Sequence, residues 1–406
     1  VVQNRGHSGP AERGAVHEKI AAGALAFGPR SRYCYEGVTP NAHSACECLP
    51  RVDAYGRSSR SLRNASILPM KLIVPMAGRG TRVRPHSHVT PKPLLKVRGR
   101  SIVERIVDTF SRVLPAPPDD GVFVLGPDFG TEIRDQLTAL CDERGITPHF
   151  PVQEEALGTA HAVGCAGEHL QGEGVVVFAD TLFGLSGEVT LGDADVVAFV
   201  REVDDPRRFG VAVRDGEEVT ELIEKPDDPV SNEALIGIYY LRELADLKAG
   251  IDHVIETDMK GAGGEYQLTD ALDHRLQEGD VFTTAGVDAW MDCGTIPALL
   301  ETTGRVLERE SGDARQGTVE DSVIHDPVYI GPGATVENAV VGPHVSIEEG
   351  ATVSDAVVRD SIVFAGGTVE NAVLADSVIG RHAAVDLRPE SLNVGDHSQV
   401  NVELRS

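Results

Sequence analysis

Short apolar runs alternate with longer amphipathic segments between about residues 70 and 310. The runs have the length and composition of buried strands, and they fall at 71–76, 122–125, 175–178 and 196–200. Segments of helical periodicity separate them, as at 101–113 and 132–144. This alternation predicts an α/β fold with a largely parallel sheet that is covered on both faces. Because ligands of such sheets collect at the carboxyl ends of the strands, the loop after Met76 and Asp180 should share one edge.

From about Thr318 onward, aliphatic residues recur at steps of five or six positions. These residues are Ile324, Ile330, Val336, Val341, Ile347, Val353, Val358, Val363, Val369, Leu374, Ile379 and Val385. A hexapeptide period is typical of a parallel β-helix, in which one aliphatic side chain per face stacks inside the coil. An irregular all-β tail is the alternative. We therefore predict an α/β domain over 70–310 and a hexapeptide-repeat domain over 311–406.

Residues 1–69 differ from the rest of the chain. They are rich in Arg, Ser, Gly and His, they show no sustained period, and they contain no Met before Met70. We expect 1–69 to be a disordered extension or a non-native N-terminus, with Met70 as the native start. A zinc site built from the cysteines and histidines of this segment is disfavoured, because its Cys-x-Cys spacing suits zinc poorly.

Charge and composition restrict the partners of the protein. The formal net charge is −26, which disfavours nucleic acid and anionic membranes and requires a locally cationic pocket for any anionic substrate. No apolar run approaches the ~20 residues of a membrane span. The six cysteines are too scattered for a disulfide framework. We expect a soluble, cytoplasmic protein that binds neither nucleic acid nor membrane.

The loop after the first apolar run is the strongest functional signal. It carries Gly78 and Gly80, then Arg82 and Arg84, and then Lys92 between two prolines. Small residues let backbone N–H groups approach phosphate oxygens, and cations neutralise those oxygens, so this pattern favours a triphosphate site. A dinucleotide-binding loop is excluded because Val83 occupies the third glycine position, and the Gly-Lys-Ser/Thr of a P-loop is absent.

The run Gly-Arg-Gly-Thr-Arg-Val-Arg-Pro followed by Pro-Lys-Pro-Leu-Leu resembles the signature of sugar-1-phosphate nucleotidyltransferases. The resemblance is nearest to glucose-1-phosphate thymidylyltransferases with a C-terminal left-handed β-helix. It implies a Rossmann-like, mostly parallel sheet of the nucleotide-diphospho-sugar transferase type, followed by a left-handed parallel β-helix. Many members have Gly where this chain has Ala77.

The resemblance also implies a nucleotide site. In it, Arg82 would stabilise the leaving pyrophosphate and Lys92 would contact the α-phosphate, which makes them the expected catalytic residues. The expected nucleotide-binding residues are Ala77, Gly78, Gly80, Thr81, Gln153 and Gly158. Gln153 and Gly158 belong to a Gln…Leu-Gly-Thr-Ala stretch that resembles the base-reading segment of the family. An amide can pair with the imide of a pyrimidine or a guanine.

Two aspartates and a second set of residues complete the implied site. Asp180 and Asp292 stand in the two contexts where the family binds a metal, and Mg²⁺ prefers a few carboxylates together with phosphate oxygens and water. The expected sugar-phosphate residues are Gly210, Glu224, Lys225 and Glu265. Taken alone, such an Asp is more often a turn former, and a Glu-Lys pair is more often an exposed surface pair.

We therefore expect an enzyme that transfers a nucleotidyl group from a nucleoside triphosphate to a hexose 1-phosphate. The preferred reaction is dTTP plus glucose 1-phosphate, giving dTDP-glucose and pyrophosphate. Alternatives are uridylyl or guanylyl transfer to N-acetylglucosamine or mannose 1-phosphate, acyl transfer by the β-helix through His344 or His382, and a non-catalytic nucleotide-sugar sensor. The partners expected are the two substrates and further copies of the chain in a homo-oligomer.

Overall fold

The computed structural model describes residues 69–388 except 79, 89, 186–191 and 311–313. These residues belong to one compact unit, Ala65–Ser406. The extension expected at 1–69 lies outside the described residues, apart from residue 69. Within the described ranges, no helix is both long and apolar enough to span a membrane.

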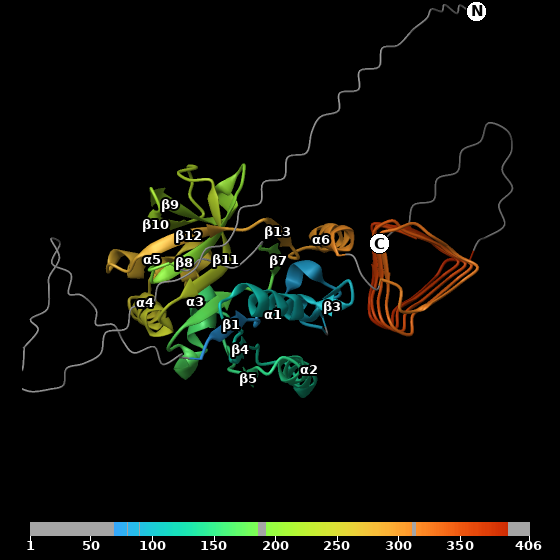
Figure 1. The fold of residues 1–406 in the computed structure, drawn as a ribbon, viewed down its shortest axis with the longest axis horizontal. Coiled ribbons are helices and arrows are strands. Elements are labelled where there is room, and N and C mark those ends of the chain that lie inside the picture. The colour runs from blue at the N-terminus through green and yellow to red at the C-terminus, as the bar shows by residue number, and fades with distance from the viewer. Residues whose placement is uncertain (1–68, 79, 89, 186–191, 311–313, 389–406) are drawn as a thin grey trace, which may run out of the picture. The chain divides into compact units, whose positions relative to one another are not determined.

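A nine-stranded sheet forms the centre of the α/β part (Figure 1), in the order β5-β4-β1-β6-β11-β8-β12-β10-β9. Its strands are β1 (Lys71–Pro75), β4 (Asp120–Val124), β5 (Thr147–His149), β6 (Gly174–Val177), β8 (Val196–Glu202), β9 (Gly210–Asp215), β10 (Glu218–Glu224), β11 (Glu233–Leu241) and β12 (Phe282–Gly286). The block β5-β4-β1-β6 is parallel, as is the pair β8–β12. β11 runs antiparallel to β6 and β8, and β10 runs antiparallel to β9, so the sheet is mixed.

Helices cover both faces of the sheet because its central strands are apolar on both sides. In β1, Leu72 and Val74 enter one core and Ile73 enters the other. The first core receives side chains of α1 (Ile102–Val113), α2 (Thr131–Asp142) and α6 (Ile296–Arg309). The second receives those of α3 (Thr159–Gly164), α4 (Leu244–Glu256) and α5 (Leu268–Gln277). The predicted α/β arrangement is confirmed.

Short elements connect the sheet to its helices. A hairpin of β2 (Lys96–Val97) and β3 (Arg100–Ser101) leads into α1, which begins one residue later than the sequence predicts because Ser101 caps it. The Ser101 hydroxyl accepts the Glu104 N–H, and the Glu104 carboxylate accepts the Ser101 N–H. A second ladder pairs β7 (Thr181–Gly184) with β13 (Ala289–Asp292). The 3-10 turns are η1 (Thr81–Val83), η2 (Lys92–Leu94), η3 (Gly167–His169), η4 (Pro206–Arg208) and η5 (Ala262–Gly264).

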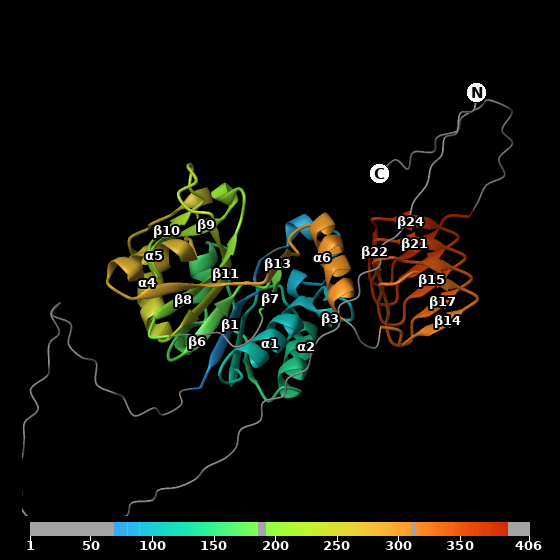
Figure 2. The same cartoon turned by 45° about the horizontal axis from the view of Figure 1, so that its top comes forward.

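The C-terminal part is a parallel β-helix with three sheets (Figure 2), as the period predicts. The first sheet contains β14 (Thr318–Glu320), β17 (Thr335–Glu337), β20 (Thr352–Ser354), β23 (Thr368–Glu370) and β26 (Ala384–Asp386). The second contains β15 (Val323–Ile324), β18 (Val340–Val341), β21 (Val357–Arg359) and β24 (Val373–Ala375). The third contains β16 (Val328–Ile330), β19 (Val345–Ile347), β22 (Ser361–Val363) and β25 (Val378–Ile379).

Left-handed backbone turns the corner after the first sheet, where the aliphatic residues are five positions apart. The corner after the first sheet is turned by Asp321, Asn338, Asp355 and Asn371, all with φ between 46° and 52°. Asn and Asp tolerate this conformation better than most residues because their short side chains can bond locally. The predicted aliphatic positions from Ile330 to Val369 are fully buried inside the coil.

One sheet of the β-helix contacts the β2–β3 hairpin. The N–H of Gly99 donates to Oε1 of Glu348 over 3.1 Å, and Ser346 donates to the same oxygen over 2.8 Å. The guanidinium of Arg98 lies 5.9 Å from the ring centre of Tyr329. Glu348 is 1% exposed, so a carboxyl group is buried at this contact.

Candidate active site

The glycine-rich loop leaves the carboxyl end of β1 and folds back toward Lys92. Gly80 has φ 54°, in the left-handed region, and precedes η1. The hydroxyl of Ser87 donates to the Gly80 carbonyl over 2.6 Å. A Cβ added to Gly80 would lie 3.3 Å from Cβ of Lys92, which together with the positive φ favours a glycine at this position. Ala77, Gly78 and Thr81 accompany Gly80 in the loop, and residue 79 is outside the described residues.

The two expected catalytic cations differ in their surroundings. Arg82 is exposed, and its side chain makes no hydrogen bond or ion pair with any residue that the structure describes. Lys92 is 8% exposed and begins η2, where the Leu95 N–H donates to its carbonyl over 3.0 Å. Its Nζ atom lies 3.9 Å from Oδ2 of Asp180. The structure therefore joins Lys92, but not Arg82, to an expected metal ligand.

A short antiparallel ladder brings the two aspartates together. Asp180 lies between β6 and β7, and Asp292 ends β13. In the β7–β13 ladder, Thr181 is paired with Asp292, and the N–H of Cys293 donates to the carbonyl of Asp180 over 3.0 Å. Two residues far apart in the sequence thus lie on adjacent strand ends.

The aspartates suit a cation that takes only part of its ligands from protein. Both side chains are exposed, and one oxygen of Asp292 accepts the Gly294 N–H over 2.6 Å. Across the part of the chain that the structure describes, no three His, Cys, Asp or Glu side chains form a metal-binding group. A hard divalent cation that keeps water and phosphate oxygens as its other ligands fits this donor set.

The segment behind Asp292 is buried and held by α6. The Thr302 hydroxyl donates to the backbone carbonyl of Asp292 over 2.6 Å, and Thr302 is 2% exposed. Cys293 is fully buried, and this burial raises the pKa of its thiol to about 12, so the thiol stays protonated at neutral pH. Sequence reasoning missed Thr302, because its contact with Asp292 arises only when α6 packs on β13.

The expected base-reading residues surround the start of α3. Gly158 has φ 124°, and a Cβ there would lie 2.4 Å from the carbonyl oxygen of Tyr266 and 3.0 Å from Cβ of Glu265. The Tyr266 N–H donates to the carbonyl of Leu157 over 2.9 Å. Gln153 is buried, and its Nε2 lies 3.4 Å from the Gly158 carbonyl oxygen. The structure thus places Gln153, Gly158 and Glu265 next to one another.

The remaining expected sugar-phosphate residues meet on β9 and β10. Gly210 is paired with Glu224 across the ladder, and a Cβ on Gly210 would lie 3.0 Å from Oε2 of Glu224. That oxygen accepts the Thr269 hydroxyl over 2.9 Å, while Oε1 of Glu224 lies 2.9 Å from Nζ of Lys225. Lys225 has φ 48°, which is unusual for a residue with a side chain. Thr269 was not predicted, although it lies in the same Gly-Glu-Tyr-Gln-Leu-Thr-Asp stretch as Glu265.

An aromatic contact connects the segment just before β9 to β13, the strand that ends in Asp292. Phe209, which precedes Gly210, packs edge-on against Trp290 with 5.0 Å between ring centres. Trp290 lies on β13, two residues before Asp292. The segments that carry the expected sugar-phosphate residues and Asp292 are therefore in contact.

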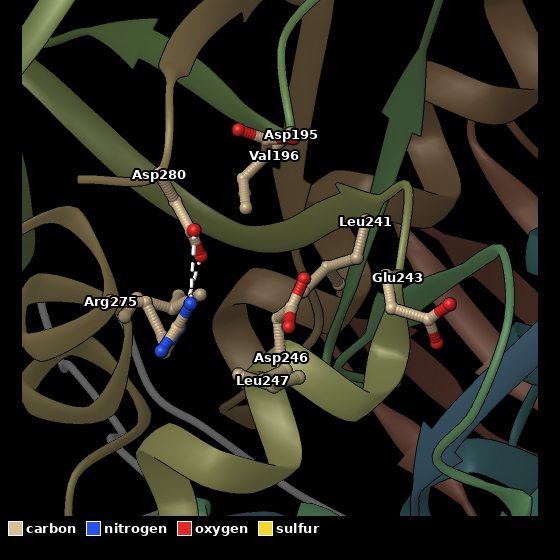
Figure 3. A pocket seen from close by; sticks show the side chains of 9 residues that line it. Asp195, Val196, Leu241, Glu243, Asp246, Leu247, Arg275 and Asp280 are labelled. Carbon is tan, nitrogen blue, oxygen red and sulfur yellow. Dashed lines mark hydrogen bonds and ion pairs between the residues drawn. The ribbon is translucent and has the colours of Figure 1, made fainter. Parts of the chain in front are cut away.

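A different place, at the amino ends of β8 and β12, holds a small pocket of about 10 Å³ (Figure 3). Arg275 and Asp280 form an ion pair there, with 2.9 Å between Nη2 and Oδ1. None of the expected site residues lines this pocket, and its volume suits about one water molecule. It is not a substrate site.

Comparison with known proteins identifies the family of the chain. The family model described as nucleotidyl transferase matches residues 71–309. A low-salt glycan biosynthesis nucleotidyltransferase of Haloferax volcanii is 31% identical over 268 residues, which cover 63% of this chain and 71% of that protein. A UTP–glucose-1-phosphate uridylyltransferase of the same organism is 30% identical over 261 residues, covering 61% of this chain and all of the relative.

A third relative extends further along the chain. A glucose-1-phosphate thymidylyltransferase of Streptomyces griseus is 27% identical over 371 residues, which cover 82% of this chain and 99% of that protein. Nucleotidyltransferases of this kind use a divalent metal. The chain belongs to the nucleotidyl transferase family and is a sugar-1-phosphate nucleotidyltransferase.

Proposed function

We propose that the protein transfers the thymidylyl group of dTTP to glucose 1-phosphate, giving dTDP-glucose and pyrophosphate. The observation that carries this choice is the length of the similarity to the Streptomyces griseus thymidylyltransferase, which covers 82% of this chain and 99% of that protein. The similarity to the Haloferax volcanii uridylyltransferase covers 61% of the chain. Uridylyl or guanylyl transfer to N-acetylglucosamine or mannose 1-phosphate is the alternative.

In the proposed reaction, a phosphate oxygen of glucose 1-phosphate attacks the α-phosphorus, and the bond from that phosphorus to the pyrophosphate oxygen breaks. The attacking oxygen is already anionic, so the protein needs no strong general base. Lys92 would hold the α-phosphate, and Arg82 would neutralise the leaving pyrophosphate. The loop from Ala77 to Thr81 would contact the triphosphate, supported by the closeness of Gly80 to Lys92.

Asp180 and Asp292 would hold Mg²⁺, which would neutralise charge on the phosphates when bound. Their adjacency across the β7–β13 ladder supports this assignment. Gly210, Glu224, Lys225 and Glu265 would bind the hexose phosphate: Glu224 would accept from sugar hydroxyls, and Lys225 would pair with the phosphate. These residues form two groups, and the contact of Phe209 with Trp290 supports a common site.

The other functional hypotheses have weaker support. For acyl transfer by the β-helix, the ring nitrogens of His344 already lie 2.9 Å from Glu308 and 3.2 Å from Asp360, which leaves the exposed His382 as the candidate base. A nucleotide-sugar sensor could lose part of the catalytic set, whereas this chain keeps Lys92 3.9 Å from Asp180, with Asp292 at the adjacent strand end. The division of the chain at about residue 310, the homo-oligomer and the cytoplasmic location stay predictions from the sequence.

A pyrophosphate-release assay tests the proposed function. The protein would be given dTTP, UTP, GTP, CTP and ATP in turn, each with glucose, N-acetylglucosamine and mannose 1-phosphate. We expect the highest kcat/KM for dTTP with glucose 1-phosphate. A higher value for another pair would replace the substrate assignment, and no release with any pair would refute the proposal.

A further inference from the structure

Two groups hold the side-chain amide of Gln153 in one place. Its Nε2 atom lies 3.0 Å from Nδ1 of His161 and 3.4 Å from the carbonyl oxygen of Gly158. The residue is 6% exposed, and its backbone N–H donates to the carbonyl of Leu125 over 2.9 Å, just beyond β4. The amide is thus fixed at the carboxyl edge of the sheet, next to the proposed base site.

The Gly158 carbonyl decides which end of the amide faces the two groups. A carbonyl oxygen can only accept, so an amide with its own oxygen on that side would place two acceptors against each other. The NH₂ group must therefore face Gly158, and the same NH₂ group then faces Nδ1 of His161. Both of its hydrogens have partners inside the protein.

The imidazole of His161 must accept at Nδ1 for this arrangement to hold. A neutral ring that accepts at Nδ1 carries its proton on Nε2. The Nε2 atom lies 4.0 Å from the sulfur of Cys165, a weak acceptor one helical turn further along. Burial raises the pKa of the Cys165 thiol, so that sulfur remains uncharged. The three side chains form one chain of donors and acceptors.

The amide oxygen is the part of Gln153 that stays available. Across the described part of the chain, Oε1 of Gln153 accepts no hydrogen bond. A nucleobase that meets it must supply a donor. At the ring nitrogen of the pairing edge, thymine and uracil offer N3–H and guanine offers N1–H, whereas cytosine N3 and adenine N1 present a lone pair. A base held with this ring nitrogen at Oε1 is therefore accepted only when the nitrogen carries a proton, and the amino groups of cytosine and adenine lie one atom further along the edge.

We propose that His161 is a positioning residue that fixes the orientation of the Gln153 amide and thereby selects nucleobases with an imide N–H. Thymine, uracil and guanine nucleotides are accepted, and cytosine and adenine nucleotides are rejected. The inference rests on the proposed function, because it takes Gln153 as a base-reading residue. A site whose hydrogen-bonding group is left unpaired by the wrong substrate discriminates strongly against it.

Two substitutions separate positioning from packing. His161→Phe keeps an aromatic ring and removes the acceptor, whereas His161→Asn places an amide oxygen close to where Nδ1 stands. We expect His161→Phe to raise the KM for dTTP by about tenfold, to leave kcat within about twofold, and to reduce the preference for dTTP over CTP by about tenfold. His161→Asn should restore most of the KM and of the preference.

A spectroscopic measurement examines the orientation directly. In protein labelled with ¹⁵N-histidine, the signals that vanish in His161→Phe should report an unprotonated Nδ1 and a protonated Nε2 at neutral pH. A proton on Nδ1 would overturn the inference, as would an unchanged KM and preference in His161→Phe. Wild-type protein that uses CTP or ATP as well as dTTP would also overturn it. If no nucleoside triphosphate supports turnover, the proposed function fails. The tautomer of His161 then still shows whether the Gln153 amide has the inferred orientation.

Discussion

The hydroxyl of Thr302 donates to the backbone carbonyl of Asp292 over 2.6 Å, from inside the packed face of α6. The next residue, Thr303, is equally buried, but its hydroxyl donates to the carbonyl of Leu299 within the same helix. The two threonines therefore have the same size, helix and burial, and only Thr302 contacts the segment that carries a proposed metal ligand.

Thr302→Val should lower activity by about 10- to 100-fold, because residues that orient a metal ligand have effects of this size. The concentration of Mg²⁺ needed for half-maximal activity should rise as well. Thr303→Val is the matched control, with a similar loss of stability and near-normal activity. Steady-state kinetics across a Mg²⁺ titration checks both variants, and equal effects of the two would show that the Thr302 contact has no special role.

Asp292→Asn should reduce turnover by at least about 100-fold while the fold stays intact, because the amide keeps the shape of the side chain but loses the negative charge that a cation requires. Circular dichroism and thermal unfolding would check the fold. Asp288→Asn is the control, because Asp288 is exposed on the same polypeptide segment, just before β13. A near-normal rate for Asp292→Asn would remove Asp292 from the metal site.

Gly210→Ala should raise the KM for hexose 1-phosphate more than the KM for the nucleotide. The added Cβ would lie 3.0 Å from Oε2 of Glu224 and 3.3 Å from the Thr269 hydroxyl, so the Glu224 carboxylate must move. We expect the KM for hexose 1-phosphate to rise by roughly tenfold and the KM for the nucleotide to change little. Gly286→Ala, at an exposed position where a Cβ meets nothing within 4 Å, is the control. A selective rise in the nucleotide KM would place Gly210 on the other side of the site.

Glu348 should make stability depend on pH. Burial raises the pKa of its carboxyl above the ordinary 4.5, although hydrogen bonds from Ser346 and Gly99 oppose this shift. Below pH 4.5 the folded and unfolded states are both protonated at this residue. As the pH rises through the interval up to the folded-state pKa, the unfolded chain releases its proton first, so stability falls.

Glu348→Gln removes this dependence and keeps an oxygen that can accept from Gly99 and Ser346. The variant should therefore melt roughly 2–4 °C higher than the wild type at pH 8 and at a similar temperature at pH 4. Glu349→Gln is the control at the neighbouring position. Calorimetry across this pH range is the measurement, and a lower melting temperature at pH 8 would mean that the charged form of Glu348 is stabilised.

The sequence suggested candidate site residues because each lies in a local motif, and their roles stay predictions. It identified the β-helix because the aliphatic period is regular. It did not specify the direction of β11, since a strand buried on both faces has the same apolar pattern in either direction. The contacts of Thr302 and Thr269 depend on how α6 and α5 pack. Their local sequence carries no sign of those partners.

His161 shows a further limit of motif reasoning. It stands within the stretch that drew attention to Gln153 and Gly158, but its position predicts only a residue in the first turn of a helix. The role that we infer for His161 depends on which ring nitrogen faces the NH₂ group of the Gln153 amide. That relationship requires coordinates.

The β7–β13 ladder restricts which substitutions the protein can tolerate during evolution. The main chain itself sets the distance between Asp180 and Asp292, through the pairing of Thr181 with Asp292 and the hydrogen bond from Cys293 to Asp180. A change in this ladder that shifts one strand against the other will alter the spacing of the two carboxylates. The two positions should therefore behave as one unit during evolution, and residues of β7 and β13 that never meet a substrate should be constrained almost as strongly as the aspartates.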